Sequence, residues 1–230
     1  PPADRSAPTT KGKNLLDEYL RIITLFFRRK DIVVIICFFL FYRFAEAQLV
    51  KMVAPFLLDA REKGGLGLST AEVGWIYGTA GVVALMLGGI LGGYAIYRRG
   101  LKFWLWPMVI IMHLPDLIFV YLSHVQPESI WFIGWAVAVE QFGYGFGFTA
   151  YTMYMIMVSQ GRYKTVFYAI ATGIMALGMM LPSMMSGWIQ ERLGYIDFYY
   201  WILITTIPGF IVAALVKIDG DYGKKETVDK

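Results

Sequence analysis

Six long apolar runs constrain the fold of this chain more than any other feature of its sequence. A helix that crosses a hydrocarbon core of about 30 Å needs about 20 largely apolar residues, and six runs of that kind follow one another. Their expected limits are 32–58, 73–97, 103–123, 130–158, 165–189 and 198–216. Short connections predict antiparallel neighbours. The pattern therefore predicts an all-α membrane protein, a bundle of six transmembrane helices.

The composition favours lipid over water as the solvent of these runs. The chain is 57% hydrophobic and 17% charged, with a mean hydropathy of +0.55, whereas soluble proteins are about 25% charged. The net charge of +4 does not indicate nucleic acid, because Lys and Arg lie at the ends of apolar runs, where lipid headgroups meet them. Cys37 is the single cysteine, which excludes a disulfide within the chain.

Polar segments flank the apolar runs. Residues 1–13 have the composition of a flexible linker. Residues 14–30 place Ile22, Ile23 and Phe26 at helical spacing, which predicts an amphipathic helix on the cytoplasmic membrane surface. The membrane domain would cover residues 31–217 and a cytoplasmic tail residues 218–230. Because the chain begins with Pro and shows no signal peptide, we expect it to be a piece of a longer protein.

The distribution of Lys and Arg predicts the orientation. If the six runs alternate in direction, sixteen of the 21 Lys and Arg fall on one side and three on the other. Since cytoplasmic loops carry the excess of positive charge, both ends of the chain are expected in the cytoplasm.

Glycines in the run 73–97 form a stripe of small residues. They recur at intervals of four, three, seven and four residues, which places them on one helix face where a second helix can approach closely. Both static packing and a surface on which a partner helix slides fit this pattern, and static packing is the simpler interpretation. The stripe consists of Gly74, Gly78, Gly81, Gly88 and Gly92, with Gly89 and Gly93 beside it.

Ionisable residues inside the apolar runs are the strongest functional signal. Placing such a residue at the centre of a membrane helix costs roughly 2.5 to 3.5 kcal/mol, so it usually faces a cavity or a partner. Arg43 and Glu46 lie near the middle of the first run, three residues apart, where they can neutralise each other on a helix. Glu140 reaches a similar depth in the fourth run, next to Gln141.

Glu140 and Glu46 are the candidate proton-coupling residues. An acid that is sheltered from water but intermittently open to it can take up and release a proton. Structural pairing that fixes helix register is the alternative, above all for Arg43 with Glu46 and for Asp116, which lies about two turns from the outer end of its run, where water could reach it. His113 is expected to be a hydrogen-bonded structural residue. No spacing typical of a metal site is visible, and no metal or cofactor is expected.

The helical face that continues from Glu140 suggests a substrate site. Tyrosine rings on this face could stack on sugar rings and hydrogen-bond their hydroxyls, although an aromatic stripe at helical spacing is more often packing. The candidate substrate-binding residues are Arg43, Gln48, Gln141, Tyr144, Tyr151 and Tyr154.

Six runs behind a basic amphipathic segment resemble the carboxyl-terminal half of a major facilitator superfamily transporter, in which two six-helix halves enclose a midplane site. The segment GGYAIYRRGLK resembles the short cytoplasmic loop motif of that superfamily. Arg98, Gly100 and Lys102 match the motif, whereas Tyr97 and Leu101 replace an Asp and an Arg. The resemblance implies that this segment is a gating loop.

Residues 139–189 are similar to the AmpG muropeptide permease group, with Gln141 in place of an Asn. This resemblance implies proton-driven import of anhydro-muropeptides through the bacterial inner membrane, with an amino-terminal half or a second copy as partner. Carriers of acetyl-coenzyme A or sugars remain alternatives. The likeness is carried by Glu140, Phe142, Gly143, Gly145, Gly147, Ala150, Tyr163, Thr165, Tyr168 and Ala169.

Two other classes of function fit the sequence less well. A channel would show a continuous polar stripe along one helix, and a membrane-embedded enzyme would need a metal or nucleophile cluster near one surface. Neither pattern is visible. The sequence therefore predicts a secondary transporter that works by alternating access, and not an enzyme.

Overall fold

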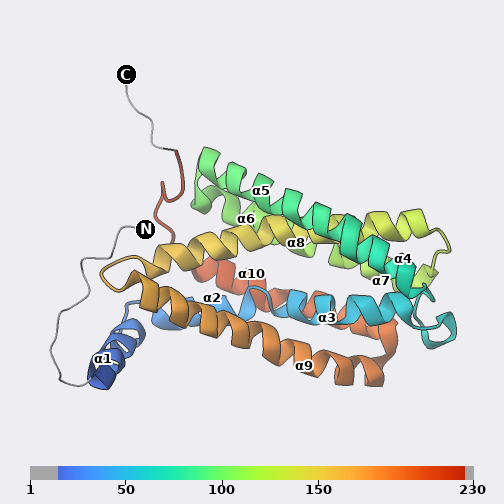
Figure 1. Cartoon of the computed structure of the whole chain (residues 1–230), viewed down its shortest axis with the longest axis horizontal. Coiled ribbons are helices and arrows are strands. Elements are labelled where there is room, and N and C mark those ends of the chain that lie inside the picture. Colours follow the sequence, from blue (N-terminus) through green and yellow to red (C-terminus); the bar gives the residue numbers. More distant parts are fainter. Residues whose placement is uncertain (1–14, 226–230) are drawn as a thin grey trace.

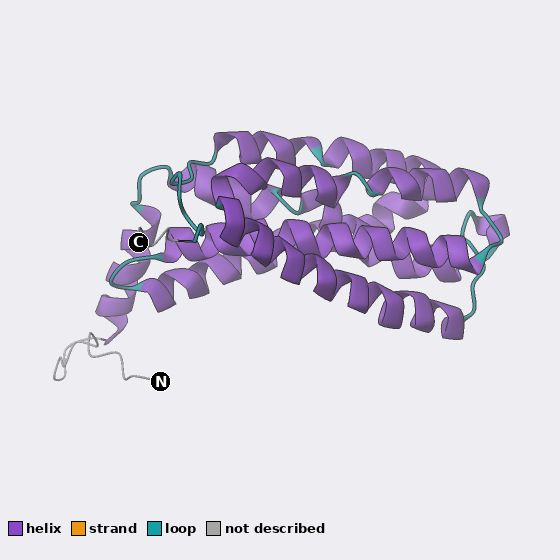
Figure 2. Ribbon diagram, turned by 90° about the horizontal axis from the view of Figure 1, so that it is seen from above, coloured by secondary structure: helices purple, strands orange, loops and turns teal. Residues whose placement is uncertain are grey.

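The apolar runs form long helices that lie side by side (Figures 1 and 2). The computed structural model describes residues 15–225, and within that range the regular structure is helical, without a strand. The predicted linker 1–13 and the last five residues of the predicted tail lie outside the described residues. The prediction of an all-α membrane bundle is confirmed.

The helix bounds follow the predicted runs to within a few residues, and we number the apolar segments in chain order. The first consists of α2 (Ile32–Phe41) and α3 (Phe44–Leu58), the second of α4 (Thr70–Val73), the π-helix η2 (Gly74–Gly81) and α5 (Val82–Arg99), the third of α6 (Leu101–His113) and α7 (Asp116–Val125), the fourth of α8 (Ile130–Ser159), and the fifth and sixth of α9 (Lys164–Thr205) and α10 (Ile207–Leu215). The 3₁₀ turn η1 (Arg61–Lys63) lies between the first two segments.

Four of these helical stretches are long and apolar enough to cross a membrane. They are Ile32–Leu58, Thr70–Arg99, Leu101–Val125 and Lys164–Leu215. The last holds both the fifth and the sixth predicted runs. Within α9, two helices meet at Gly194, which has φ 76° and is not helical, and the chain turns back on itself between them (Figure 1).

Two segments are interrupted near their middle. Between α2 and α3, Arg43 has φ −112° and ψ 19°, which is not helical. Between α6 and α7, the chain breaks at Pro115, as expected of a residue that cannot continue the hydrogen-bond ladder. Such discontinuous helices place polar backbone and side chains inside membrane proteins, where cavities and partners can satisfy them.

The segments rich in Lys and Arg meet at one end of the bundle. Lys217 Nζ lies 3.1 Å from Asp31 Oδ2, which joins the start of α2 to the chain after α10. Arg29 donates to the carbonyl oxygens of Val158 and Gln160 at the end of α8. The alternating arrangement that the charge count requires is therefore present, while the side of the membrane stays a prediction.

The predicted amphipathic helix is present as α1 (Leu15–Phe27). Ile22 and Phe26 are buried, and the Phe26 ring lies 5.6 Å from the ring of Phe167 in α9. Leu20 and Phe27 are about half exposed on the other side. The helix thus docks on the bundle by one edge and leaves a second apolar edge uncovered.

Glycines bring α5 and α8 into backbone contact. A Cβ atom at Gly88 would lie 2.2 Å from the carbonyl oxygen of Phe142, and one at Gly145 would lie 2.2 Å from that of Leu85. No atom lies within 4 Å of the corresponding position at Gly78. The predicted stripe therefore divides into a part locked against α8 and a part that faces outward.

Candidate functional site

The two candidate proton-coupling acids meet in the interior of the bundle. Glu46 extends from α3 and Glu140 from α8, and neither side chain is more than 1% exposed. They lie close enough to interact electrostatically. The sequence placed the two acids at a similar depth in separate segments. In the structure they lie close together because α3 and α8 both direct these side chains into the bundle.

Most of the carboxylate oxygens in this site lack a hydrogen-bond donor. Glu140 Oε2 accepts a hydrogen bond of 3.0 Å from Gln141 Nε2. Among residues 15–225, Glu140 Oε1 and both oxygens of Glu46 have no hydrogen-bond partner. A buried polar atom without a partner costs roughly 1 to 3 kcal/mol, and more when the group is charged. The arrangement therefore does not stabilise the fold.

Arg43 forms no ion pair with Glu46, so the predicted pairing of these two residues is wrong. Its guanidinium Cζ lies 4.4 Å from the ring centre of Phe148 and 4.9 Å from that of Tyr144, and the group donates to the Tyr144 hydroxyl. Within residues 15–225, no Lys or Arg nitrogen lies within 4.0 Å of a Glu46 or Glu140 oxygen. The break before α3 removes the helical spacing on which the expectation depended.

The third segment contributes two residues that the sequence did not assign to this site. His113 Nδ1 lies 3.4 Å from Asp116 Oδ2, and both side chains are buried. Asp116 is 1% exposed, so of the possibilities left open for it the structure shows a buried side chain and not one in contact with water. Both interact electrostatically with Glu46. The signal was the sequence His-Leu-Pro-Asp, in which the proline break brings the two polar side chains together.

The structure brings together a group of residues that could hold a metal ion, which the spacing of residues in the sequence did not indicate. One possible ligand atom from each of Glu46, His113 and Asp116 lies within 4.8 Å of the other two, and all three residues are buried. Sequence spacing could not reveal this group because it combines residues of the first and third segments.

The tyrosines predicted to bind substrate divide into two groups. Tyr144 is half-buried and adjoins Arg43 in the polar site. Tyr151 donates to the carbonyl oxygen of Phe39, and the Tyr154 ring centre lies 4.5 Å from that of Phe38. In this conformation Tyr151 and Tyr154 pack in the core. This position fits the alternative in which the tyrosine stripe serves packing and not substrate binding.

Gln48 connects the first segment to the sixth. Trp201 Nε1 donates a hydrogen bond of 2.9 Å to Gln48 Oε1, and Gln48 Nε2 donates to the carbonyl oxygen of Phe44. Both polar atoms of Gln48 are thus engaged, unlike the oxygens of Glu46.

The predicted gating loop lies at the Lys- and Arg-rich end of the bundle, away from the buried acids. Gly100 has φ 82°, a conformation that glycine adopts without strain. Arg98 donates to the Tyr94 hydroxyl, and Lys102 is exposed. The backbone nitrogen of Leu101 donates to the carbonyl oxygen of Tyr222, so the chain after α10 covers this loop.

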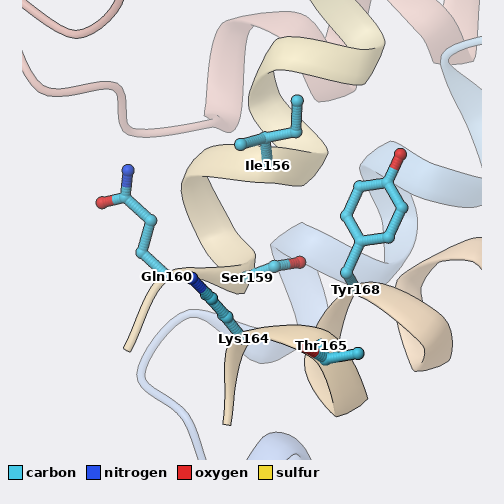
Figure 3. Close-up of a pocket in the computed structure, with 6 residues that line it drawn as sticks. All are labelled: Ile156, Ser159, Gln160, Lys164, Thr165 and Tyr168. Atoms are coloured by element: carbon cyan, nitrogen blue, oxygen red, sulfur yellow. The ribbon is translucent and has the colours of Figure 1, made fainter. Parts of the chain in front are cut away.

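A cavity of about 310 Å³ lies at the same end, between the last turn of α8 and the first turn of α9 (Figure 3). Its walls contain none of the predicted site residues. It is lined by Ile156, Ser159, Gln160, Lys164, Thr165 and Tyr168.

Comparisons with known proteins agree with the membrane architecture. No family model matches the chain. It is 26% identical over 89% of its length to "Putative transporter AmpG 1" of Rickettsia prowazekii, covering 46% of that protein. It is 25% identical over 89% of its length to "Putative transporter AmpG 4" of Rickettsia conorii, covering 51% of it. The protein named "Putative transporter AmpG 1" in Rickettsia bellii is 26% identical over 81% of the chain, with 44% of that protein covered.

The chain spans about half the length of the curated relatives it matches. The similarity extends over most of the chain, including the segments that carry Glu46 and Glu140. Apolar helices of spanning length indicate a multi-pass membrane protein, and most of the chain is similar to one half of proteins that are named putative AmpG transporters.

Proposed function

We propose that this chain acts as the carboxyl-terminal half of a proton-coupled transporter of the major facilitator type, which imports a sugar-peptide such as an anhydro-muropeptide by alternating access. The observation that carries the proposal is the pair of buried acids, Glu140 and Glu46, which lie close together with no Lys or Arg nitrogen of the described residues within 4.0 Å of either carboxylate. Acids in this position are costly inside a membrane and are typical of proton or ion pathways.

Glu140 is the proposed proton carrier. When both acids are ionised, Glu140 and Glu46 repel each other, and a proton on Glu140 removes that repulsion. Gln141 holds one oxygen of Glu140 and leaves the other without a partner, where a proton can bind. Proton uptake from one side and release to the other would then favour opposite conformations of the bundle.

Arg43 and Tyr144 are the proposed contacts to substrate. Arg43 is 5% exposed, and within the described part of the chain its Nε has no hydrogen-bond partner and its guanidinium forms no ion pair with an acid. An anionic group of a peptide or lactyl moiety could therefore bind there, with Tyr144 supplying a hydroxyl and a ring face for the sugar. Gln141 can add a polar contact beside them.

A partner half is supported by the exposed face of α9. Four large apolar side chains within two turns are more than half exposed, and no atom lies within 4 Å of a Cβ placed at Gly173 or Gly187 on the same helix. A second six-helix unit can approach such a surface closely. The exposed side chains are Met180, Leu181, Met184 and Met185.

The test is uptake of labelled anhydro-muropeptide by cells that lack any other importer for it and produce the chain with its amino-terminal half. Glu140→Gln should abolish uptake driven by a pH gradient while keeping exchange of substrate without a gradient. Glu62→Gln, at an exposed position in η1, is the matched control and should behave like the wild type.

Gradient-driven uptake that is unchanged by Glu140→Gln would reject the proton role. If the wild type ignores muropeptide but carries acetyl-coenzyme A or a simple sugar, the substrate assignment is wrong and the transporter class stands.

A further inference from the structure

We propose that Glu46, His113 and Asp116 form a binding site for a divalent first-row transition-metal ion, with Zn²⁺ as the representative. One ligand atom from each residue lies within 4.8 Å of the other two. The ion would join the first segment to the third in the interior of the bundle. This inference does not rest on the proposed function, because metal binding is independent of the substrate.

The separation between two of the ligand atoms suits a common ion. Two ligands at about 2.1 Å from a tetrahedral zinc lie about 3.4 Å apart. His113 Nδ1 and Asp116 Oδ2 are 3.4 Å apart, yet their orientation makes no hydrogen bond. An ion between them would satisfy both atoms, and a small inward movement of the Glu46 carboxylate would complete a three-residue site.

Each of the three side chains is buried without a hydrogen bond. Glu46, Asp116 and His113 are 0%, 1% and 4% exposed, and neither carboxylate nor either imidazole nitrogen has a hydrogen-bond partner among the described residues. Six polar atoms in one place thus lack the partners that buried groups normally have. A metal ion supplies a partner for three of them at once.

The charges of the site match a divalent cation. Two carboxylates contribute two negative charges, and the guanidinium of Arg43 contacts the rings of Tyr144 and Phe148 and forms no ion pair with either carboxylate. His113 lies 3.4 Å from Asp116 and carries a positive charge only when it is protonated. Unpaired buried charge costs several kcal/mol per ion. A divalent ion would neutralise both carboxylates without help from Arg43.

The ligand types distinguish between metals. Mg²⁺ and Ca²⁺ prefer oxygen ligands alone, whereas one imidazole nitrogen with carboxylate oxygens suits Zn²⁺ and its first-row neighbours. Three protein ligands leave a fourth position open to water. Glu140 is not among the ligands, and a bound ion would weaken the repulsion between Glu46 and an ionised Glu140.

The breaks in two segments create this arrangement. Glu46 lies in the first turn of α3, directly after the non-helical Arg43, and His113 and Asp116 end α6 and begin α7 on either side of Pro115. An ion at this point would hold the two breaks together. We therefore expect metal binding to stabilise the bundle.

The test uses the purified full chain in detergent after treatment with a chelator. Zn²⁺ should bind at one ion per chain by elemental analysis and should raise the midpoint of thermal unfolding, whereas Mg²⁺ and Ca²⁺ should not. Glu46→Gln and His113→Asn should weaken zinc binding more than about tenfold. His124→Asn is the matched control, because His124 is the other histidine of the chain and is exposed, 3.1 Å from the Tyr200 hydroxyl; it should bind zinc like the wild type.

Two results would overturn the proposal. The first is a wild type that binds no zinc, which would leave the cluster as a site for shared protons. The second is zinc binding that survives Glu46→Gln or depends on His124, which would place the ion on the surface. If His113→Asn fails to fold by circular dichroism, the isosteric Glu46→Gln decides. Co²⁺ absorption typical of tetrahedral nitrogen and oxygen ligands should then appear in the wild type and be lost in that variant.

Discussion

The helix α8 makes two kinds of contact, and they are built in opposite ways. Toward α5, Gly145 allows backbone to meet backbone, with no room for a single added carbon atom. Toward α3, Glu140 meets Glu46, and three of their four carboxylate oxygens have no hydrogen-bond partner. The face of α8 toward α5 is closely packed, whereas on the face toward α3 most carboxylate oxygens lack hydrogen-bond donors.

The difference separates a face of α8 that stabilises the fold from a face that carries the proposed function. Close contacts at glycines increase the dispersion energy between helices and fix the position of α8. Such packing is a main source of helix association in lipid. Unsatisfied buried acids have the opposite effect on stability. They are consistent with a site that needs a proton, an ion or a substrate to complete it.

The largest effect on stability should come from Gly145→Ala. The new Cβ would lie 2.2 Å from the Leu85 carbonyl oxygen, so α5 and α8 must separate. Overpacking of this kind costs about 1 to 3 kcal/mol or more, measured as the free energy of unfolding in detergent. Gly173→Ala in α9 is the control, because no atom lies within 4 Å of its Cβ position. Equal behaviour of the two variants would show that the α5–α8 contact is not tight.

An intermediate effect on stability is expected from removing the hydroxyl of Tyr42, which contacts α8. The Tyr42 hydroxyl donates a hydrogen bond of 3.0 Å to the carbonyl oxygen of Gly147, and Tyr42 is fully buried. Tyr42→Phe should therefore lower the free energy of unfolding by about 1 kcal/mol. Tyr121→Phe, at a side chain that is half exposed, should change it by a few tenths at most. A loss in both variants would indicate a general effect of removing a hydroxyl.

The smallest effect should come from Glu140→Gln. One oxygen of Glu140 has no partner, and the amide keeps the shape while it removes a buried acid. We expect the free energy of unfolding to stay within about 1 kcal/mol of the wild type, or to rise. A loss as large as that of Gly145→Ala would show that the acid is structural, and the contrast between the two faces would fail.

The sequence predicted the residues of the polar site better than their contacts. Glu46 and Glu140 could be paired because helix rise converts residue number into depth. Arg43 was misassigned because its contacts depend on a backbone break that hydropathy does not reveal. His113 and Asp116 were assigned other roles for a related reason, since the direction of their side chains depends on how the chain resumes its helix after Pro115.

The sequence by itself determined the helical membrane fold, the approximate limits of its segments and the charge difference between its two ends. These properties depend on length, apolar content and charge along the chain, which are local. Only the tertiary structure decided that α8 locks against α5, that Arg43 turns away from Glu46, and that Glu46 meets His113 and Asp116. Those contacts depend on how separate helices rotate and pack against one another, and no property of a single segment contains that information.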